Sequence, residues 1–144
     1  MNMLDPMILR QIIMDHYQYP RNKRLVDDEH YRMVHMASES CIDDIKVQVN
    51  IENGIIKDMC FDGIACTIST ASTSILTDLV KGKTIEEAKE LISLYMDMIM
   101  LKEVNLEPLE EAIAFHQVGK QANRIKCATI GWNALSQIIE ESEE

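Results

Sequence analysis

Residues 45–61 read IKVQVNIENGIIKDMCF, and this stretch decides the fold. Apolar and polar side chains alternate over residues 45–52, which is typical of a strand with one buried face. Asn53-Gly54 then predicts a tight hairpin turn. Residues 55–61 return as the partner strand, so the stretch predicts an antiparallel pair.

The register of this hairpin depends on the turn. A strict two-residue loop places Val47 opposite Cys60. A one-residue bulge instead brings Met59 and Phe61 to the apolar face. We favour the bulge because it buries the larger side chains. On this interpretation Cys60 faces away from the core and is not a candidate ligand.

Helical periodicity surrounds the hairpin. Residues 7–17 predict a helix that stops at Pro20, and residues 31–36 predict a first strand. After the hairpin, apolar residues recur at helical spacing in three segments, and Pro108 suits the first turn of a short helix; the segments are residues 68–79, 85–99 and 127–139. Strands followed by helices favour one α+β domain over residues 1–144, in which a small three-stranded antiparallel sheet carries helices on one face and the C-terminal half is helical.

Composition excludes several classes of protein. The formal net charge is −10, from 14 Lys and Arg against 24 Asp and Glu, so we expect no nucleic-acid partner. No apolar stretch reaches the length of a membrane span, so we expect no membrane partner and a cytoplasmic protein. Thiols stay reduced in the cytoplasm, where cysteines more often bind metal or do chemistry than form disulfides.

Three separated cysteines and one carboxylate are the candidate site: Cys41, Asp43, Cys66 and Cys127. Three thiolates and a carboxylate make a closed four-ligand set of the kind that zinc accepts. Cys66 and Cys127 lie at expected helix N-termini, where backbone N–H groups favour an anion. Cysteine is also often a small buried hydrophobe, and separated cysteines are weaker evidence than paired ones. The four histidines are scattered, so ordinary surface or core roles suit them better than a ligand role.

Three motifs then resemble a known family. They are Asp15-His16-Tyr17-Gln18-Tyr19-Pro20-Arg21-Asn22, Phe61-Asp62-Gly63-Ile64-Ala65-Cys66-Thr67-Ile68-Ser69 and Arg124-Ile125-Lys126-Cys127-Ala128-Thr129. In order and spacing they resemble the U-type iron–sulfur cluster assembly proteins, over nearly the whole chain. The extra segment from about Leu94 to Ala122, and Lys126 where the IscU branch carries a histidine, favour the SufU branch.

The resemblance implies a zinc-bound sulfur acceptor in iron–sulfur cluster assembly, with Cys41, Asp43, Cys66 and Cys127 as metal ligands. It implies that Cys41 accepts persulfide sulfur from a pyridoxal-phosphate-dependent cysteine desulfurase and that the sulfur passes to a downstream iron–sulfur scaffold or acceptor. Arg124 matches a motif arginine that could hold an anionic thiolate or persulfide, although a surface role fits it equally well. His16 and the adjacent Tyr17–Arg21 segment would contribute to docking.

Two alternatives stay open: a scaffold for a nascent [2Fe–2S] cluster, and a structural or regulatory zinc protein without sulfur transfer. If the chain is a zinc-bound sulfur acceptor, we expect a sulfurtransferase-like relay rather than a stand-alone enzyme.

The sequence also departs from the family pattern Asn-Pro-Thr-Cys-Gly-Asp. Between the first two ligands, Cys41 and Asp43, it has Ile42 where the pattern has glycine. Ala65 replaces a glycine before Cys66. Isoleucine strongly disfavours positive φ, so we expect the Cys41 loop to move less freely.

Overall fold

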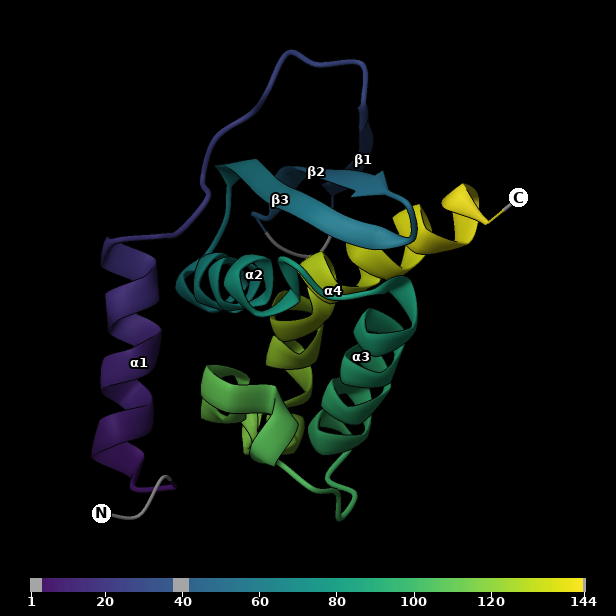
Figure 1. Ribbon diagram of the computed structural model, residues 1–144. Helices are drawn as coiled ribbons and strands as arrows, with labels where there is room; N and C mark the ends of the chain where they lie inside the picture. Colours follow the sequence, from purple (N-terminus) through teal and green to yellow (C-terminus); the bar gives the residue numbers. More distant parts are fainter. Residues whose placement is uncertain (1–3, 38–41, 144) are drawn as a thin grey trace.

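The computed structural model describes residues 4–37 and 42–143. One helix precedes the three strands and the other helices follow them, an arrangement of the α+β class (Figure 1). The elements are α1 (Pro6–Gln18), β1 (Tyr31–Ala37), β2 (Asp44–Glu52), β3 (Ile55–Ile64), α2 (Thr67–Val80), α3 (Ile85–Ile99), the 3-10 segments η1 (Glu107–Phe115) and η2 (Val118–Lys120), and α4 (Ala122–Ser142). Within the described residues, no helix combines the length and the apolar character needed to cross a membrane.

The sheet is antiparallel in the order β1-β2-β3. Val47 pairs with Phe61 and Val49 pairs with Met59, and the register shifts by one residue between Asn50 and Ile51. The predicted bulge is therefore confirmed. It places the larger β3 side chains on the same buried face as the valines of β2.

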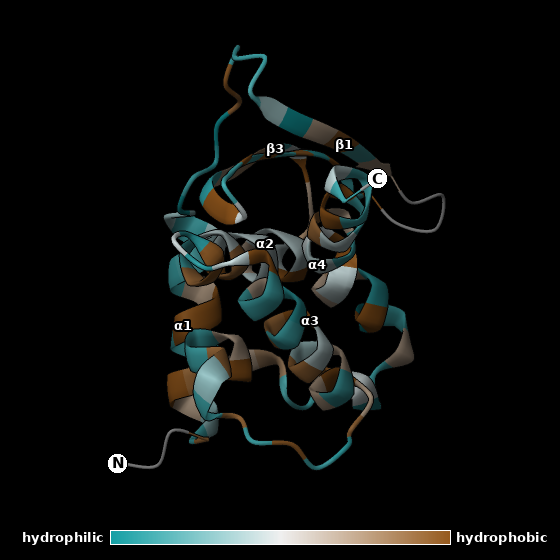
Figure 2. Ribbon diagram, turned by 45° about the vertical axis from the view of Figure 1, so that its right-hand side comes forward, coloured by the Kyte–Doolittle hydropathy of each residue, from teal (hydrophilic) through white to brown (hydrophobic). Residues whose placement is uncertain are grey.

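Helices α2 and α4 pack against that apolar face, and α3 lies beside α4 (Figures 1 and 2). Helix α1 stands at one side of the molecule, where it contacts α2 and η1. The predicted arrangement of a small sheet with helices on one face, and a helical C-terminal half, is confirmed. A capping box begins α3, because the Thr84 side chain accepts from Glu87 N and the Glu87 side chain accepts from Thr84 N.

The opposite face of the sheet is covered by the segment between α1 and β1. The backbone of Val26 exchanges two 2.8 Å hydrogen bonds with the side-chain amide of Gln48. Cys60 lies opposite Gln48 and is fully buried, with its thiol 3.5 Å from Gln48 Oε1. Cys60 does face away from the main core, as the bulge requires, but it is not exposed there. The covering segment lies far from it in the sequence, which is why strand periodicity alone gave no sign of this burial.

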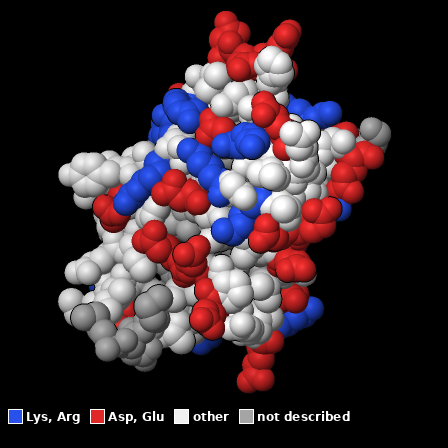
Figure 3. Space-filling model, viewed as in Figure 1, with Lys and Arg blue, Asp and Glu red and all other residues white. Residues whose placement is uncertain are grey.

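The covering segment contains three basic residues, Arg21, Lys23 and Arg24. In the upper left part of Figure 3, Lys and Arg side chains lie among Asp and Glu side chains. The three basic residues of the segment, and Lys81 after α2, form ion pairs: Arg21–Asp15, Lys23–Asp62, Arg24–Asp58 and Lys81–Asp58. Pairing with carboxylates therefore offsets much of the positive charge of this region.

Helices α2 and α4 cross at very short range. A side chain at Gly131 of α4 would place its Cβ 2.5 Å from Thr73 Oγ1 of α2, closer than real atoms approach. Next to this crossing, Ser72 accepts a 3.0 Å hydrogen bond from Trp132 Nε1 and donates a 2.7 Å hydrogen bond to the carbonyl of Ala128. The ring of Trp132 stacks on Tyr95 of α3. These contacts fix the position of α4 relative to α2 near Cys127.

Candidate metal centre

Asp43, Cys66 and Cys127 come together in space. One ligand atom from each lies within 4.8 Å of the other two. They arrive from three parts of the fold: Asp43 directly precedes β2, Cys66 directly precedes α2, and Cys127 lies on α4. Cys41, the fourth candidate ligand and the expected sulfur acceptor, lies outside the described residues.

Cys66 occupies the position predicted for it. It is the N-cap of α2, and its Sγ accepts a hydrogen bond of 3.4 Å from the backbone N–H of Ser69. An N-terminal helix position of this kind favours a negatively charged sulfur. The backbone of α2 thus supplies one of the contacts that a thiolate needs.

The prediction for Cys127 was wrong in one respect. Helix α4 begins at Ala122, so Cys127 lies in its second turn, beyond the first-turn N–H groups. No side chain caps this helix start, which removes the usual sequence signal for it. Cys127 is instead placed by the crossing of α2 and α4.

Asp43 is a buried carboxylate, only 1% exposed. Its Oδ1 accepts a 2.9 Å hydrogen bond from the backbone N–H of Cys66. Its Oδ2 accepts a short hydrogen bond from the hydroxyl of Ser69, which is itself fully buried. Sequence reasoning did not single out Ser69; its only sequence signal is a hydroxyl three residues after the cysteine that caps the helix.

The electrostatics of the cluster favour a cation. Burial, followed by the neighbouring Cys66 thiol and the Asp43 carboxylate, raises the pKa of Cys127 well above its usual range. Two sulfurs and a carboxylate this close repel one another once they are deprotonated, unless a positive ion lies between them. Thiolate sulfur and carboxylate oxygen are both ligands that zinc accepts, so the residues present fit this metal.

The other predicted participants differ in their surroundings. Arg124 is exposed in the first turn of α4, and its guanidinium forms no ion pair with any of the described residues. His16 is fully buried away from the cluster, where Nδ1 lies 2.8 Å from Ser74 Oγ and Nε2 lies 3.2 Å from Glu111 Oε1. His16 therefore joins α1 to α2 and η1. Ile42 directly precedes Asp43, and Ile64 lies two residues before Cys66. They are 65% and 70% exposed, so this end of the sheet has an apolar surface.

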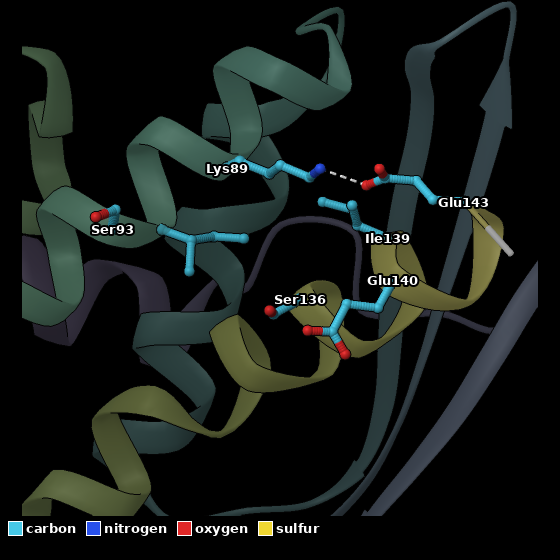
Figure 4. A pocket seen from close by; sticks show the side chains of 7 residues that line it. Lys89, Ser93, Ser136, Ile139, Glu140 and Glu143 are labelled. Atoms are coloured by element: carbon cyan, nitrogen blue, oxygen red, sulfur yellow. Dashed lines mark ion pairs between the residues drawn. The ribbon is translucent and has the colours of Figure 1, made fainter.

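A cavity of about 530 Å³ lies elsewhere, between α3 and α4 (Figure 4). Its lining includes Ile92 and Ile139, and an ion pair of 2.5 Å joins Lys89 to Glu143 across it. None of its lining residues belongs to the cluster of Asp43, Cys66 and Cys127. The cavity and the candidate metal cluster are therefore separate places in the structure.

In this α+β domain, one end of the sheet and two helices bring two thiols and a carboxylate together. Such an arrangement is typical of small metal-binding or sulfur-handling proteins. The chain belongs to the family of NifU-like N-terminal domains, whose model matches residues 8–143. This confirms the resemblance to the U-type assembly proteins.

Individual relatives agree with this assignment. The chain is 38% identical to the zinc-dependent sulfurtransferase SufU of Bacillus subtilis (strain 168), over 94% of this chain and 92% of the relative. It is 36% identical to the iron–sulfur cluster assembly scaffold protein IscU of Streptococcus pyogenes serotype M1, over 91% and 82% respectively. Among solved structures, a putative iron–sulfur cluster assembly scaffold protein for the SUF system from Fervidobacterium islandicum AW-1 matches with a TM-score of 0.79 and 27% identity, over 88% of this chain and 92% of that one.

Proposed function

We propose that this protein works in iron–sulfur cluster assembly as a zinc-bound sulfur acceptor. It would take sulfur from a pyridoxal-phosphate-dependent cysteine desulfurase and pass it to a downstream scaffold or acceptor. The observation that carries the proposal is the convergence of Asp43, Cys66 and Cys127, with ligand atoms within 4.8 Å of one another. Similarity to a relative described as a zinc-dependent sulfurtransferase supports the choice of metal and of reaction.

Asp43, Cys66 and Cys127 would hold the zinc together with Cys41, which stands two residues before Asp43 in the chain. When bound, zinc keeps its cysteine ligands deprotonated at neutral pH. Asp43, Cys66 and Cys127 would hold the ion while Cys41 acts as the nucleophile. The resemblance assigns sulfur transfer to Cys41, so Cys41 would be the ligand that leaves.

The transfer step is a thiol–disulfide type exchange. The Cys41 thiolate attacks the terminal sulfur of the persulfide on the desulfurase. A new S–S bond forms at Cys41, the S–S bond of the donor breaks, and the cysteine of the donor leaves as a thiolate. Electrons balance within the exchange, so the step needs no external oxidant or reductant.

Arg124 is the residue that the family motif suggests for holding the resulting anion. It lies on α4 three residues before Cys127 and is exposed. A guanidinium is a permanent cation with several N–H donors, so it can pair with a negatively charged sulfur. We therefore expect Arg124→Ala to slow sulfur transfer more than it changes zinc content.

A second candidate is a scaffold on which a [2Fe–2S] cluster is assembled. The 36% identity to a relative described as an assembly scaffold favours it, and thiolates also hold such clusters. The same donor atoms would serve, so geometry alone does not separate the two functions. A structural or regulatory zinc protein is the third possibility, and it would show no sulfur transfer.

The decisive experiment has two parts. Protein purified without oxygen is assayed for zinc, iron and acid-labile sulfide, and is then mixed with cysteine desulfurase and cysteine before mass analysis of Cys41. One zinc per chain, no sulfide, and an added sulfur atom on Cys41 are the expected results. Iron with matching sulfide would support the scaffold, and zinc with unmodified Cys41 would support the structural protein. Cys41→Ser should remove the added sulfur, whereas the control Cys60→Ser should keep it, because Cys60 is buried away from the cluster.

A further inference from the structure

The contacts of Ser69 distinguish it from the other buried hydroxyl residues of α2. Its hydroxyl donates to Asp43 Oδ2 and lies 3.3 Å from Cys66 Sγ, while its backbone N–H donates to the same sulfur at 3.4 Å. Ser69 thus touches two of the three clustered donors from one position on the helix. It is fully buried, so water does not compete for these contacts.

The direction of the hydrogen bond follows from the chemistry of the partners. A carboxylate only accepts, so the single hydroxyl hydrogen of Ser69 points at Asp43. The backbone N–H of Cys66 holds the other carboxylate oxygen at 2.9 Å. Both donors belong to the start of α2, whereas Asp43 precedes β2. The start of α2 therefore contributes a hydrogen bond to each oxygen of the carboxylate.

We propose that Ser69 is a positioning residue, which holds the Asp43 carboxylate toward the sulfur atoms of Cys66 and Cys127 and so sets how tightly and how long this cluster retains a metal ion. The inference rests on the proposed zinc site. Residues that hydrogen-bond a metal ligand usually change metal affinity by about 10- to 100-fold when they are removed. Without the hydroxyl, the carboxylate loses one of the contacts that orient it toward the two sulfur atoms.

The chain offers a matched control for this proposal. Ser74 is also a fully buried serine of α2, but its hydroxyl contacts His16 Nδ1 and the backbone N–H of Arg21, both at 2.8 Å. Ser69→Ala and Ser74→Ala therefore remove comparable hydrogen bonds from one helix. Only the first removes a contact to the candidate ligands.

The test measures zinc dissociation constants and dissociation rates with a competing chromogenic chelator, and records the absorption bands of the cobalt-substituted proteins. We expect Ser69→Ala to raise the zinc dissociation constant about 10- to 100-fold and to change the cobalt spectrum. Ser74→Ala should leave both within about twofold of the parent, even if thermal unfolding shows that both variants are destabilised. Equal effects of the two substitutions on the dissociation constant would overturn the positioning role.

A double-mutant cycle with Asp43→Ala identifies the group through which Ser69 acts. If Ser69 works by orienting Asp43, then Ser69→Ala should change zinc affinity less than about twofold once the carboxylate is gone. An undiminished effect in that background would overturn the proposal and assign the effect to Cys66. Failure of the parent protein to bind zinc would overturn the proposed metal centre, whereas normal zinc binding by both the parent and Ser69→Ala would overturn only the role of Ser69.

Discussion

Replacing Gly131 by alanine tests the close crossing of α2 and α4, which places Cys127 near Cys66. In an exposed helix the change from glycine to alanine would stabilise the protein by roughly 0.5–1 kcal/mol. Here the new Cβ would lie 2.5 Å from Thr73 Oγ1 and 2.9 Å from Thr73 Cγ2, so the Thr73 side chain or the helices must shift. Overpacking of this kind costs about 1–3 kcal/mol. We expect Gly131→Ala to destabilise the protein by about 1 kcal/mol net, once the helix propensity gain is subtracted.

Whether Gly131→Ala stabilises or destabilises the protein should depend on the side chain at position 73. Thr73→Ala removes the two closest atoms and leaves only the Cβ of residue 73, at 3.1 Å. In that background the propensity gain remains while most of the clash is gone, so Gly131→Ala should become neutral or stabilising by up to about 1 kcal/mol. Urea unfolding of the four proteins, with a chelator present to remove any metal contribution, measures both values. The same destabilisation in both backgrounds would refute the close contact between these residues.

Further predictions concern pH, metal content and the sheet end near the cluster. Although burial opposes it, hydrogen bonds from Tyr31, Arg24 and Lys81 lower the pKa of Asp58 from 3.8 to about 2. This depressed pKa contributes stability above pH 4, and that stability is lost as the pH falls through 2. Asp58→Asn should therefore destabilise the protein by about 2 kcal/mol at pH 7 and hardly at all below pH 2. Urea unfolding measured across this pH range checks both values. Cys127→Ser should lower the zinc bound per chain while Cys60→Ser leaves it unchanged, and elemental analysis after dialysis checks both. Gly63→Ala should lower the free energy of unfolding by more than about 2 kcal/mol and lower the thermal midpoint. The reason is that Gly63 has φ of +135° and a Cβ there would lie 2.2 Å from the carbonyl oxygen of Asp44. A thermal midpoint within about 2 °C of the parent would contradict this.

The sequence predicted those features whose cause is local. The hairpin and its bulge follow from alternation and from Asn53-Gly54, because a strand buries one face and a bulge shifts that face by one residue. The position of Cys66 at a helix N-terminus was predicted for a similar local reason. Features that depend on distant segments were missed. The burial of Cys60 comes from the covering segment around Val26, and the uncapped start of α4 concealed that Cys127 lies one turn into the helix.

Helix α2 shows why the candidate site was only partly predictable. Its Ser and Thr residues have poor helix propensity, yet nearly all of the helix is buried. Hydroxyls buried without partners would be costly, but Ser69 binds Asp43, Ser72 binds the carbonyl of Ala128, and Ser74 binds His16. Each hydrogen bond fixes a different segment to the same helix, and none is visible from the spacing of serines alone. The polar composition of α2 is therefore explained by the geometry it imposes: it gives up intrinsic helix stability and gains fixed positions for the segments that bring Asp43, Cys66 and Cys127 together.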